Sequence, residues 1–248
     1  MTIDLNCDMG ESFGRYTLGA DAFVMPLITS ANIACGLHAG DPSVMRLTIR
    51  LAKQHGASIG AHPGWPDLQG FGRREMSFSA DETESLVLYQ IGALAAFCRA
   101  EGAELRHVKP HGALYNQAAK DPVLAAAIAA AVKSFDPHLI LVGLAGSAMI
   151  DAGHALGLRV ANEAFPDRRY NPDGTLMPRG RAEALLADPQ EVAAHAVSLA
   201  RDGIDFGGRQ IKVDTLCLHG DHAHAAENAR LVRLALQKAG EEVSALEP

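Results

Sequence analysis

The sequence predicts an α/β protein built as a parallel β/α barrel of about seven strands, and three observations predict this fold. Short apolar runs alternate with helical patterns along the whole chain, which is typical of parallel strands joined by right-handed helical crossovers. No linker or low-complexity segment divides the 248 residues, so we expect a single domain over residues 1–248. The nucleotide-binding fingerprints of open, doubly wound sheets, G-x-G-x-x-G and G-x-x-x-x-G-K-[ST], do not occur, which favours the barrel.

Seven segments have the length and the apolar or β-branched composition of buried strands. They are residues 3–7, 29–35, 57–61, 105–109, 139–143, 158–162 and 211–218. In a closed barrel the carboxyl ends of such strands surround one mouth, and the chemistry of this fold class collects there.

The helices between these strands are marked at their starts. Three of them are predicted to begin at an Asp-Pro pair, in which the aspartate caps the helix and the proline takes its first position. The pairs are residues 41–42, 121–122 and 188–189. Ser79 and Glu82 form a capping box that predicts a long helix over 80–101.

Charge and composition exclude several classes of partner. The net charge is −7 and no run of Lys or Arg exceeds a pair, which argues against nucleic acid or an anionic membrane as the main partner. No apolar stretch approaches the roughly 20 residues that span a bilayer. The first residues lack the charged and apolar regions of a signal peptide, so we expect a soluble, cytoplasmic protein. The oligomeric state is left open, a homo-oligomer included.

The four cysteines show no C-x-x-C spacing. They are Cys7, Cys35, Cys98 and Cys217. In a cytoplasmic protein such cysteines are expected to be reduced and buried as small apolar side chains.

Polar and ionisable residues follow six of the seven predicted strands. They are Asn6, Asp8, Glu11 and Arg15 after the first strand, His38 and Asp41 after the second, His62 after the third, Lys109, His111 and Tyr115 after the fourth, Asn162, Glu163, Asp167, Arg168 and Tyr170 after the sixth, and His219 and Asp221 after the seventh. A single histidine in such a place more often caps a strand or satisfies a loop carbonyl. Four histidines at the same relative position, residues 38, 62, 111 and 219, indicate a functional mouth instead.

Two chemistries fit these residues. Asp8 with His38 and His62 would suit a divalent metal, although no compact spacing such as H-E-x-x-H occurs. The same side chains could perform general acid–base catalysis without a metal. Lys109 beside His111 could stabilise an oxyanion or a phosphoryl group. Alternatively, Lys109 is an inward-facing lysine paired with Glu163 or Asp8, which would not exclude a catalytic role.

The loop after the third strand, G-A-H-P-G-W-P-D-L-Q-G-F-G-R-R, has an unusual composition. Its prolines and glycines would fix its path, and Trp65 or Phe71 would cover the pocket. Arg73 and Arg74 at its end, like Arg168 after the sixth strand, could hold a carboxylate or phosphate in a fork, or could be ordinary surface charge.

Seven blocks of the sequence, in order from residue 3 to about 240, resemble one family. They are D-L-N-C-D-M-G-E-S-F-G, A-N-I-A-C-G-L-H-A-G-D-P, the G-A-H-P-G-W loop, V-K-P-H-G-A-L-Y-N, E-A-F-P-D-R-R-Y, D-G-T-L-M-P-R and C-L-H-G-D. The family is the lactam-utilisation (LamB/YcsF) family, that is, the A subunits of 5-oxoprolinases. The resemblance implies a seven-stranded barrel of the glycoside hydrolase/deacetylase type. It also implies ATP-dependent opening of 5-oxo-L-proline (pyroglutamate) to L-glutamate together with subunits B and C, and Mg²⁺ is expected with ATP.

On this hypothesis each candidate residue takes a role. The catalytic candidates are Asp8, His62, Lys109, His111 and Glu163. The substrate-binding candidates are Asn6, Arg73, Arg74, Tyr115, Arg168, His219 and Asp221, and the metal candidates are Asp8, His38 and His62. Two other functions stay open: a metal-dependent amide or carbohydrate deacetylase or hydrolase that needs neither ATP nor partners, and a non-catalytic subunit that presents the substrate.

Overall fold

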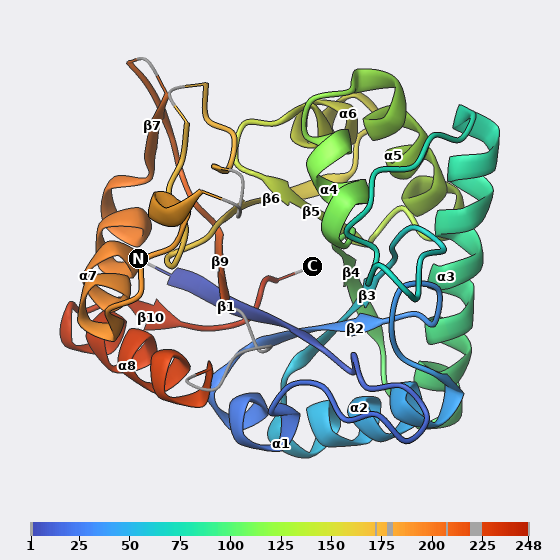
Figure 1. Cartoon of the computed structure of the whole chain (residues 1–248), viewed down its shortest axis with the longest axis horizontal. Coiled ribbons are helices and arrows are strands. Elements are labelled where there is room, and N and C mark those ends of the chain that lie inside the picture. The colour runs from blue at the N-terminus through green and yellow to red at the C-terminus, as the bar shows by residue number, and fades with distance from the viewer. Residues whose placement is uncertain (1, 172, 178–180, 207, 219–224, 248) are drawn as a thin grey trace.

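Seven parallel strands form a closed barrel at the centre of the molecule (Figure 1). The computed structural model describes residues 2–171, 173–177, 181–206, 208–218 and 225–247. The barrel strands are β1 (Thr2–Met9), β2 (Ser30–Ala34), β3 (Ser58–His62), β4 (Leu105–Val108), β5 (Ile140–Leu144), β6 (Arg159–Ala164) and β9 (Thr215–Leu218). Pairing of β1 with β9, in register from Asp4↔Thr215 to Cys7↔Leu218, closes the ring. The predicted barrel is therefore confirmed.

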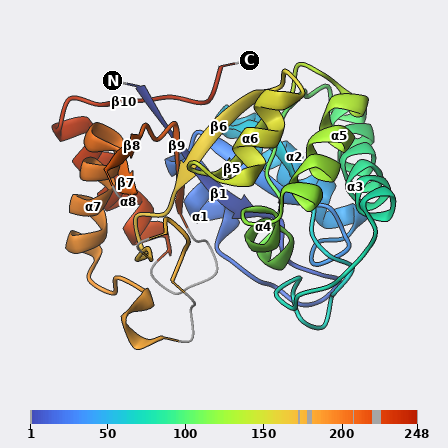
Figure 2. The same ribbon diagram turned by 90° about the horizontal axis from the view of Figure 1, so that it is seen from above.

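Helices surround the barrel on its outside (Figures 1 and 2). They are α1 (Asp21–Val24), α2 (Pro42–His55), α3 (Ala80–Ala100), α4 (Gly112–Ala118), α5 (Pro122–Phe135), α6 (Ala148–Ala155), α7 (Pro189–Asp202) and α8 (Ala225–Lys238), with 3₁₀ turns η1 (Met25–Leu27) and η2 (Ala182–Ala184). The predicted caps are confirmed, because Asp41, Asp121 and Asp188 each accept from backbone N–H groups of the first turn. The capping box of Ser79 and Glu82 is also present.

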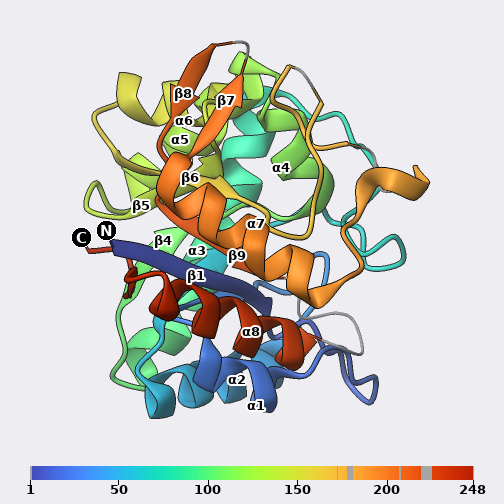
Figure 3. The same ribbon diagram turned by 90° about the vertical axis from the view of Figure 1, so that its left-hand side faces the viewer.

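The seventh barrel strand is shorter than predicted. The sequence predicted a strand over 211–218, but β9 begins at Thr215. Of the preceding residues, Ile211 ends β8 (Arg209–Ile211), which forms an antiparallel hairpin with β7 (Ile204–Phe206) at the top of Figure 3, and residues 212–214 belong to no strand. The carboxylate of Asp214 then accepts the backbone N–H of Asn162 at 3.0 Å. Composition alone could not separate the hairpin strand from the barrel strand, since both are rich in β-formers.

The two faces of β1 have opposite character. Ile3, Leu5, Cys7 and Met9 are buried in the large hydrophobic core. Asp4, Asn6 and Asp8 bond to side chains of other barrel strands across the interior. Successive strand residues point to opposite faces, so the polar set lines the inside of the barrel. As predicted, all four cysteines are free and buried.

The first and last described residues lie at the end of the barrel where the strands begin (Figure 2). β10 (Glu242–Val243) pairs with the first residues of β1. Leu246 then packs against Ile140, Val142 and Ala161. The opposite end, where the strands finish, stays available for a site. Among the described residues, none of the helices is long and apolar enough to cross a membrane.

Candidate functional site

A cavity of about 620 Å³ lies at the carboxyl ends of the strands, on the face that the sequence predicted. Seven of the predicted site residues belong to its wall: Asp8, His62, Arg73, Lys109, His111, Tyr115 and Arg168. Glu11, Gln117 and Phe165 also line it. The fold therefore gathers residues that are far apart in the sequence around one space.

The ammonium group of Lys109 lies at the floor of the cavity and is surrounded by four polar partners. Its Nζ lies 2.9 Å from Asp8 Oδ1 and 2.9 Å from Glu163 Oε1. It also lies 3.2 Å from Asn6 Oδ1 and 3.0 Å from Cys217 Sγ. Burial alone would lower the pKa of Lys109, but Asp8 and its other negative neighbours outweigh it and raise the pKa well above its usual value. Lys109 thus stays positively charged, and the predicted pairing with Glu163 or Asp8 is confirmed for both.

Asp8 is shared between Lys109 and His62. Its Oδ1 faces Lys109, and its Oδ2 lies 3.3 Å from Nε2 of His62. Burial opposes ionisation, yet His62 and Lys109 hold the pKa of Asp8 well below its usual range. The carboxylate is therefore an ionised acceptor at the cavity wall.

Asn6 lies beneath this floor and is 2% exposed. Its Nδ2 donates to Glu163 Oε1 at 2.9 Å and to Thr215 Oγ1 at 2.7 Å. Its Oδ1 accepts from Asn32 Nδ2 at 2.7 Å. The amide is fully engaged with protein groups, and Asn6 is not one of the residues that line the cavity. The observed contacts make it a support for Lys109 and Glu163, and its predicted role in binding substrate stays a prediction.

The sequence did not predict a set of buried polar residues that lies beneath the cavity floor. Its members are Asp4, Asn32, His107, Thr215 and Cys217. Burial raises the pKa of Asp4 to about 6, although hydroxyl donors from Thr215, Ser30 and Thr29 oppose the rise. Burial, with smaller effects of Lys109 and His62, lowers the pKa of His107 to about 3, so this imidazole is neutral. The signal that could have found part of this set is the strict alternation of residues 3–9, I-D-L-N-C-D-M, because strands buried on both faces usually read as continuous apolar runs.

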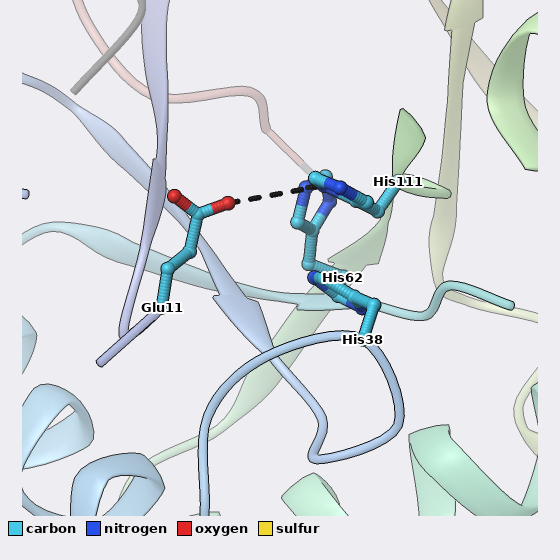
Figure 4. A group of neighbouring side chains, drawn as sticks. All are labelled: Glu11, His38, His62 and His111. Atoms are coloured by element: carbon cyan, nitrogen blue, oxygen red, sulfur yellow. Dashed lines mark hydrogen bonds and ion pairs between the residues drawn. The ribbon is translucent and has the colours of Figure 1, made fainter. Parts of the chain in front are cut away.

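Three histidines and a glutamate form a cluster (Figure 4), and one of them, His62, contacts Asp8. Nδ1 of His62 donates to the carbonyl of Lys109 at 2.7 Å, because a carbonyl can only accept. Nε2 of His111 donates to the carbonyl of Phe71 at 2.8 Å for the same reason. The remaining ring nitrogens, His62 Nε2 and His111 Nδ1, face each other at 2.9 Å. Held in this way, the two rings direct these nitrogens at one shared point, which favours a bound cation or a shared proton.

His38 completes the cluster. It stacks on His111 with ring centroids 3.9 Å apart, and both of its ring nitrogens are buried without a hydrogen-bond partner. Burial, followed by His111 and His62, holds the pKa of His38 well below its usual value. An orphaned neutral imidazole of this kind is available as a metal ligand.

The cluster fits a divalent metal. One ligand atom each from Glu11, His38, His62 and His111 lies within 4.8 Å of all the others. Backbone carbonyls that fix the ring orientation, as they do here for His62 and His111, are typical of histidine ligands. His38 and His62 belong to the predicted metal set, while Glu11 and His111 were not assigned this role. Asp8 lies beside the cluster and its role as a ligand stays a prediction.

The loop after β3 supports the cluster rather than covering the cavity with its tryptophan. Trp65 is 1% exposed, and its Nε1 donates to Gln117 Oε1 at 2.7 Å. The prediction that Trp65 covers the pocket is wrong, because the indole is packed inside the loop against Phe78. Phe71 instead places its ring edge-on to His38 and His111.

The predicted substrate-binding residues are distributed unevenly. Arg73, Arg168 and Tyr115 line the cavity. Arg74 does not, since its guanidinium pairs with Asp67, with Nε 3.0 Å from Oδ2, and its side chain is 62% exposed. His219 and Asp221 lie outside the described residues.

Comparison with known proteins gives consistent results. The model of the LamB/YcsF family matches residues 3–248. A Methylococcus capsulatus protein, named as the A subunit of 5-oxoprolinase, is 58% identical, with 99% of this chain and 96% of that protein covered. A Bacillus subtilis protein of the same name is 52% identical, with 98% and 96% covered.

Solved structures agree with the fold. The crystal structure of the lactam utilization protein from Thermus thermophilus is 49% identical and has a TM-score of 0.92, covering 99% of this chain and 100% of that one. A family 4 carbohydrate esterase from Streptomyces lividans, in complex with acetate, has a TM-score of 0.53 at 11% identity, covering 100% of this chain and 93% of that one. The second likeness is one of fold alone and confirms the predicted barrel type.

Proposed function

The chain belongs to the LamB/YcsF family, and from this premise we propose that it is the A subunit of a 5-oxoprolinase. The observation that carries the proposal is near-full-length similarity to proteins of that name, at 58% identity for the one from M. capsulatus. The proposed reaction is ATP-dependent opening of 5-oxo-L-proline to L-glutamate with subunits B and C. ATP is a co-substrate and Mg²⁺ accompanies it.

The substrate sets the task of the site. A lactam amide is a poor electrophile, because its nitrogen shares its lone pair with the carbonyl. Transfer of the terminal phosphoryl group of ATP to the amide oxygen gives a carbon that water attacks more readily. Water adds to that carbon, and the tetrahedral species collapses by breaking the carbon–nitrogen bond, which leaves an acyl phosphate. A second water attacks the acyl phosphate, and phosphate leaves with the former amide oxygen to give the new carboxylate. The ring nitrogen takes up a proton and becomes the amine of glutamate.

The residues of the cavity floor suit the first part of this reaction. Lys109 carries a buried positive charge at the cavity wall, next to Asp8 and Glu163. A preorganised cation of this kind stabilises negative charge on a reacting oxygen or phosphoryl group. Glu163 and Asn6 hold the ammonium in place from below. His111 directs the lone pair of its Nδ1 at His62, so charge stabilisation falls to Lys109.

Water activation falls to Asp8 and His62. The two side chains are 3.3 Å apart at the cavity, so one can accept the proton of the attacking water while the other orients it. Arg73 or Arg168 on the cavity wall holds the substrate carboxylate.

Glu11, His38, His62 and His111 are the residues that would hold a divalent metal, with Asp8 as a further candidate. A metal bound there would polarise a carbonyl or lower the pKa of a bound water. In that case His62 serves as a ligand and Asp8 is the group left to accept the proton.

Activity of the three-subunit mixture tests the proposal. Phosphate release and glutamate formation are measured with wild type, Asp8→Asn and Lys109→Ala, and both variants should lose at least about 100-fold in kcat. Lys120→Ala is the matched control, because Lys120 is a second lysine of the cavity wall, whereas the ion pairs with Asp8 and Glu163 are made by Lys109. Full activity of both Asp8→Asn and Lys109→Ala would refute the site.

The histidine cluster favours a second candidate, a metal-dependent amide or carbohydrate hydrolase. It predicts about one tightly bound divalent ion per chain and turnover without ATP or partners. Metal content of the purified chain, with an ATP-free assay on lactams and acetylated sugars, separates the two. A non-catalytic role in presenting the substrate is separated by 5-oxoproline binding: it predicts unchanged chemistry in Asp8→Asn and Lys109→Ala whenever binding survives.

A further inference from the structure

Phe71 has a strained backbone next to the histidine cluster. Its φ is 55°, and within the part of the chain that the structure describes it is the one residue other than glycine with a positive φ. For a side chain with a Cβ, this left-handed conformation costs about 1–2 kcal/mol. Strain of this kind persists where the surrounding structure imposes it, and it concentrates at functional sites.

The loop around Phe71 is fixed at several points. The N–H of Gly72 donates to the carbonyl of Asp67 at 2.9 Å, and the N–H of Gly70 donates to Asp67 Oδ1 at 2.9 Å. The carbonyl of Gly72 accepts from Ala113 at the start of α4, also at 2.9 Å. A Cβ at Gly72 would lie 2.7 Å from Cβ of His38, so the backbone already touches the stacked imidazoles. The carbonyl of Phe71 therefore has little freedom to move.

Glycine would adopt this conformation without strain, so the side chain of Phe71 must have its own use. Its ring lies edge-on to His111, with centroids 5.1 Å apart, and edge-on to His38 at 6.1 Å. The guanidinium of Arg73 lies 4.9 Å from the same ring. The ring of Phe71 thus packs against the two imidazoles, while the carbonyl of Phe71 accepts a hydrogen bond from Nε2–H of His111.

We propose that Phe71 is a positioning residue whose left-handed backbone fixes the tautomer of His111. With Nε2 committed to the carbonyl of Phe71, Nδ1 carries the lone pair and is aimed at His62 Nε2, at 2.9 Å, and at Glu11 Oε1, at 3.8 Å. The role of His111 in the reaction belongs to the proposed function, but the control of its tautomer does not depend on that function.

Three substitutions separate the effect of the backbone conformation of Phe71 from the effect of its aromatic ring. Phe71→Asn and Phe71→Gly remove the ring but tolerate the left-handed conformation, whereas Phe71→Val disfavours it because valine is β-branched. The readout is the ring ¹⁵N shifts of His111 in the labelled full chain, assigned with His111→Asn. These shifts distinguish a donor nitrogen from an acceptor. Wild type, Phe71→Asn and Phe71→Gly should all show Nε2 as the donor, and Phe71→Val should show a mixture of tautomers.

Activity gives a second readout in the three-subunit enzyme. Phe71→Val should lower kcat about 10- to 100-fold with KM changed less than about threefold, and Phe71→Asn should recover most of the loss. An unchanged His111 tautomer in Phe71→Val overturns the proposal. So does a loss of the tautomer in Phe71→Asn and Phe71→Gly, because it would assign the effect to the ring. The tautomer measurement stands even if the assembled enzyme shows no 5-oxoprolinase activity.

Discussion

The inside of the barrel has a polar region and an apolar region, and the two are stabilised in different ways. The polar region is formed by Asp4, Asn6, Asp8, Ser30, Asn32, His107, Lys109, Glu163 and Thr215, joined by hydrogen bonds and ion pairs. The apolar region is formed by Ile140, Val142 and Ala161, with Leu246 packed against them. Barrels of this class more often fill their interior with branched apolar residues.

The difference explains how this chain combines a stable barrel with a charged site. Apolar contacts are non-directional, so a truncated side chain costs roughly in proportion to the volume removed. In the polar region Asp4, Asn6, Asn32 and Lys109 each bond to two or more others, so the deletion of one of them leaves several buried partners unsatisfied. The polar region supports the cavity, and its stability depends on these pairings.

The largest expected effect comes from breaking the charge pairing at Lys109. Lys109→Met leaves Asp8 and Glu163 facing each other without the ammonium that both contact. Removing one partner of a buried ion pair typically costs about 3–5 kcal/mol, so the free energy of unfolding should fall by that amount. Urea unfolding at pH 7 measures it.

Ile140→Val is the matched change in the apolar region and should cost only about 0.5–1.5 kcal/mol. The double variant Lys109→Met/Glu163→Gln should recover part of the loss, because one uncompensated charge is gone. Equal losses for Lys109→Met and Ile140→Val would contradict the proposed difference between the regions.

A pH-dependent effect is expected from Asp4. Burial raises its pKa from 3.8 to about 6, so the folded state prefers the protonated carboxyl. The stabilisation is therefore fully present below pH 3.8 and is lost as the pH rises through about 6. Asp4→Asn removes this titration. Relative to the variant, wild type should lose up to about 3 kcal/mol between pH 4 and pH 7.

Unfolding curves of wild type and Asp4→Asn at these two pH values measure the difference in their free energies of unfolding. The contributions of titrating groups that both proteins share cancel in this difference. The depressed pKa of Asp8 acts in the opposite direction but is present in both. A difference that stays constant with pH would show that Asp4 titrates normally in the fold.

The fold could be predicted from the sequence much further than the site. Strand composition and Asp-Pro caps are local signals, and six predicted strands agree with the structure within two residues at either end. The strand ends also indicated Asp8, His62, Lys109 and His111 correctly as members of one cavity. Topology alone brings the ends of parallel strands together, so no side-chain detail was needed.

The contacts within the site could not be predicted in the same way. The pairing of Arg74 with Asp67 depends on the path of the loop, and so does the burial of Trp65. The stacking of His38 on His111 joins two strands that are not neighbours in the sheet. His107 belongs to no motif in the sequence, and no site role is predicted for Asn32; their contacts appear only when the barrel closes around Asn6.

A smaller loss in the free energy of unfolding should follow from filling the space between Gly60 and His107. Gly60 lies on β3, and a Cβ at this position would overlap the imidazole of His107, which bonds to Asn32 Oδ1 at 2.8 Å. Gly60→Ala should therefore destabilise the protein by about 1–3 kcal/mol through overpacking. Gly92→Ala is the matched control: nothing lies within 4 Å of its Cβ, and alanine in α3 should stabilise by about 0.5–1 kcal/mol.

The double variant Gly60→Ala/His107→Ala locates the cause. If the overlap with His107 is responsible, the double variant is less destabilised than the sum of the two single variants, and the coupling energy from urea unfolding is about 1 kcal/mol or more. Additive losses would mean that Gly60 is required for its own backbone rather than for the imidazole. In that case the polar region would not depend on Gly60 for the room that His107 needs to orient Asn32.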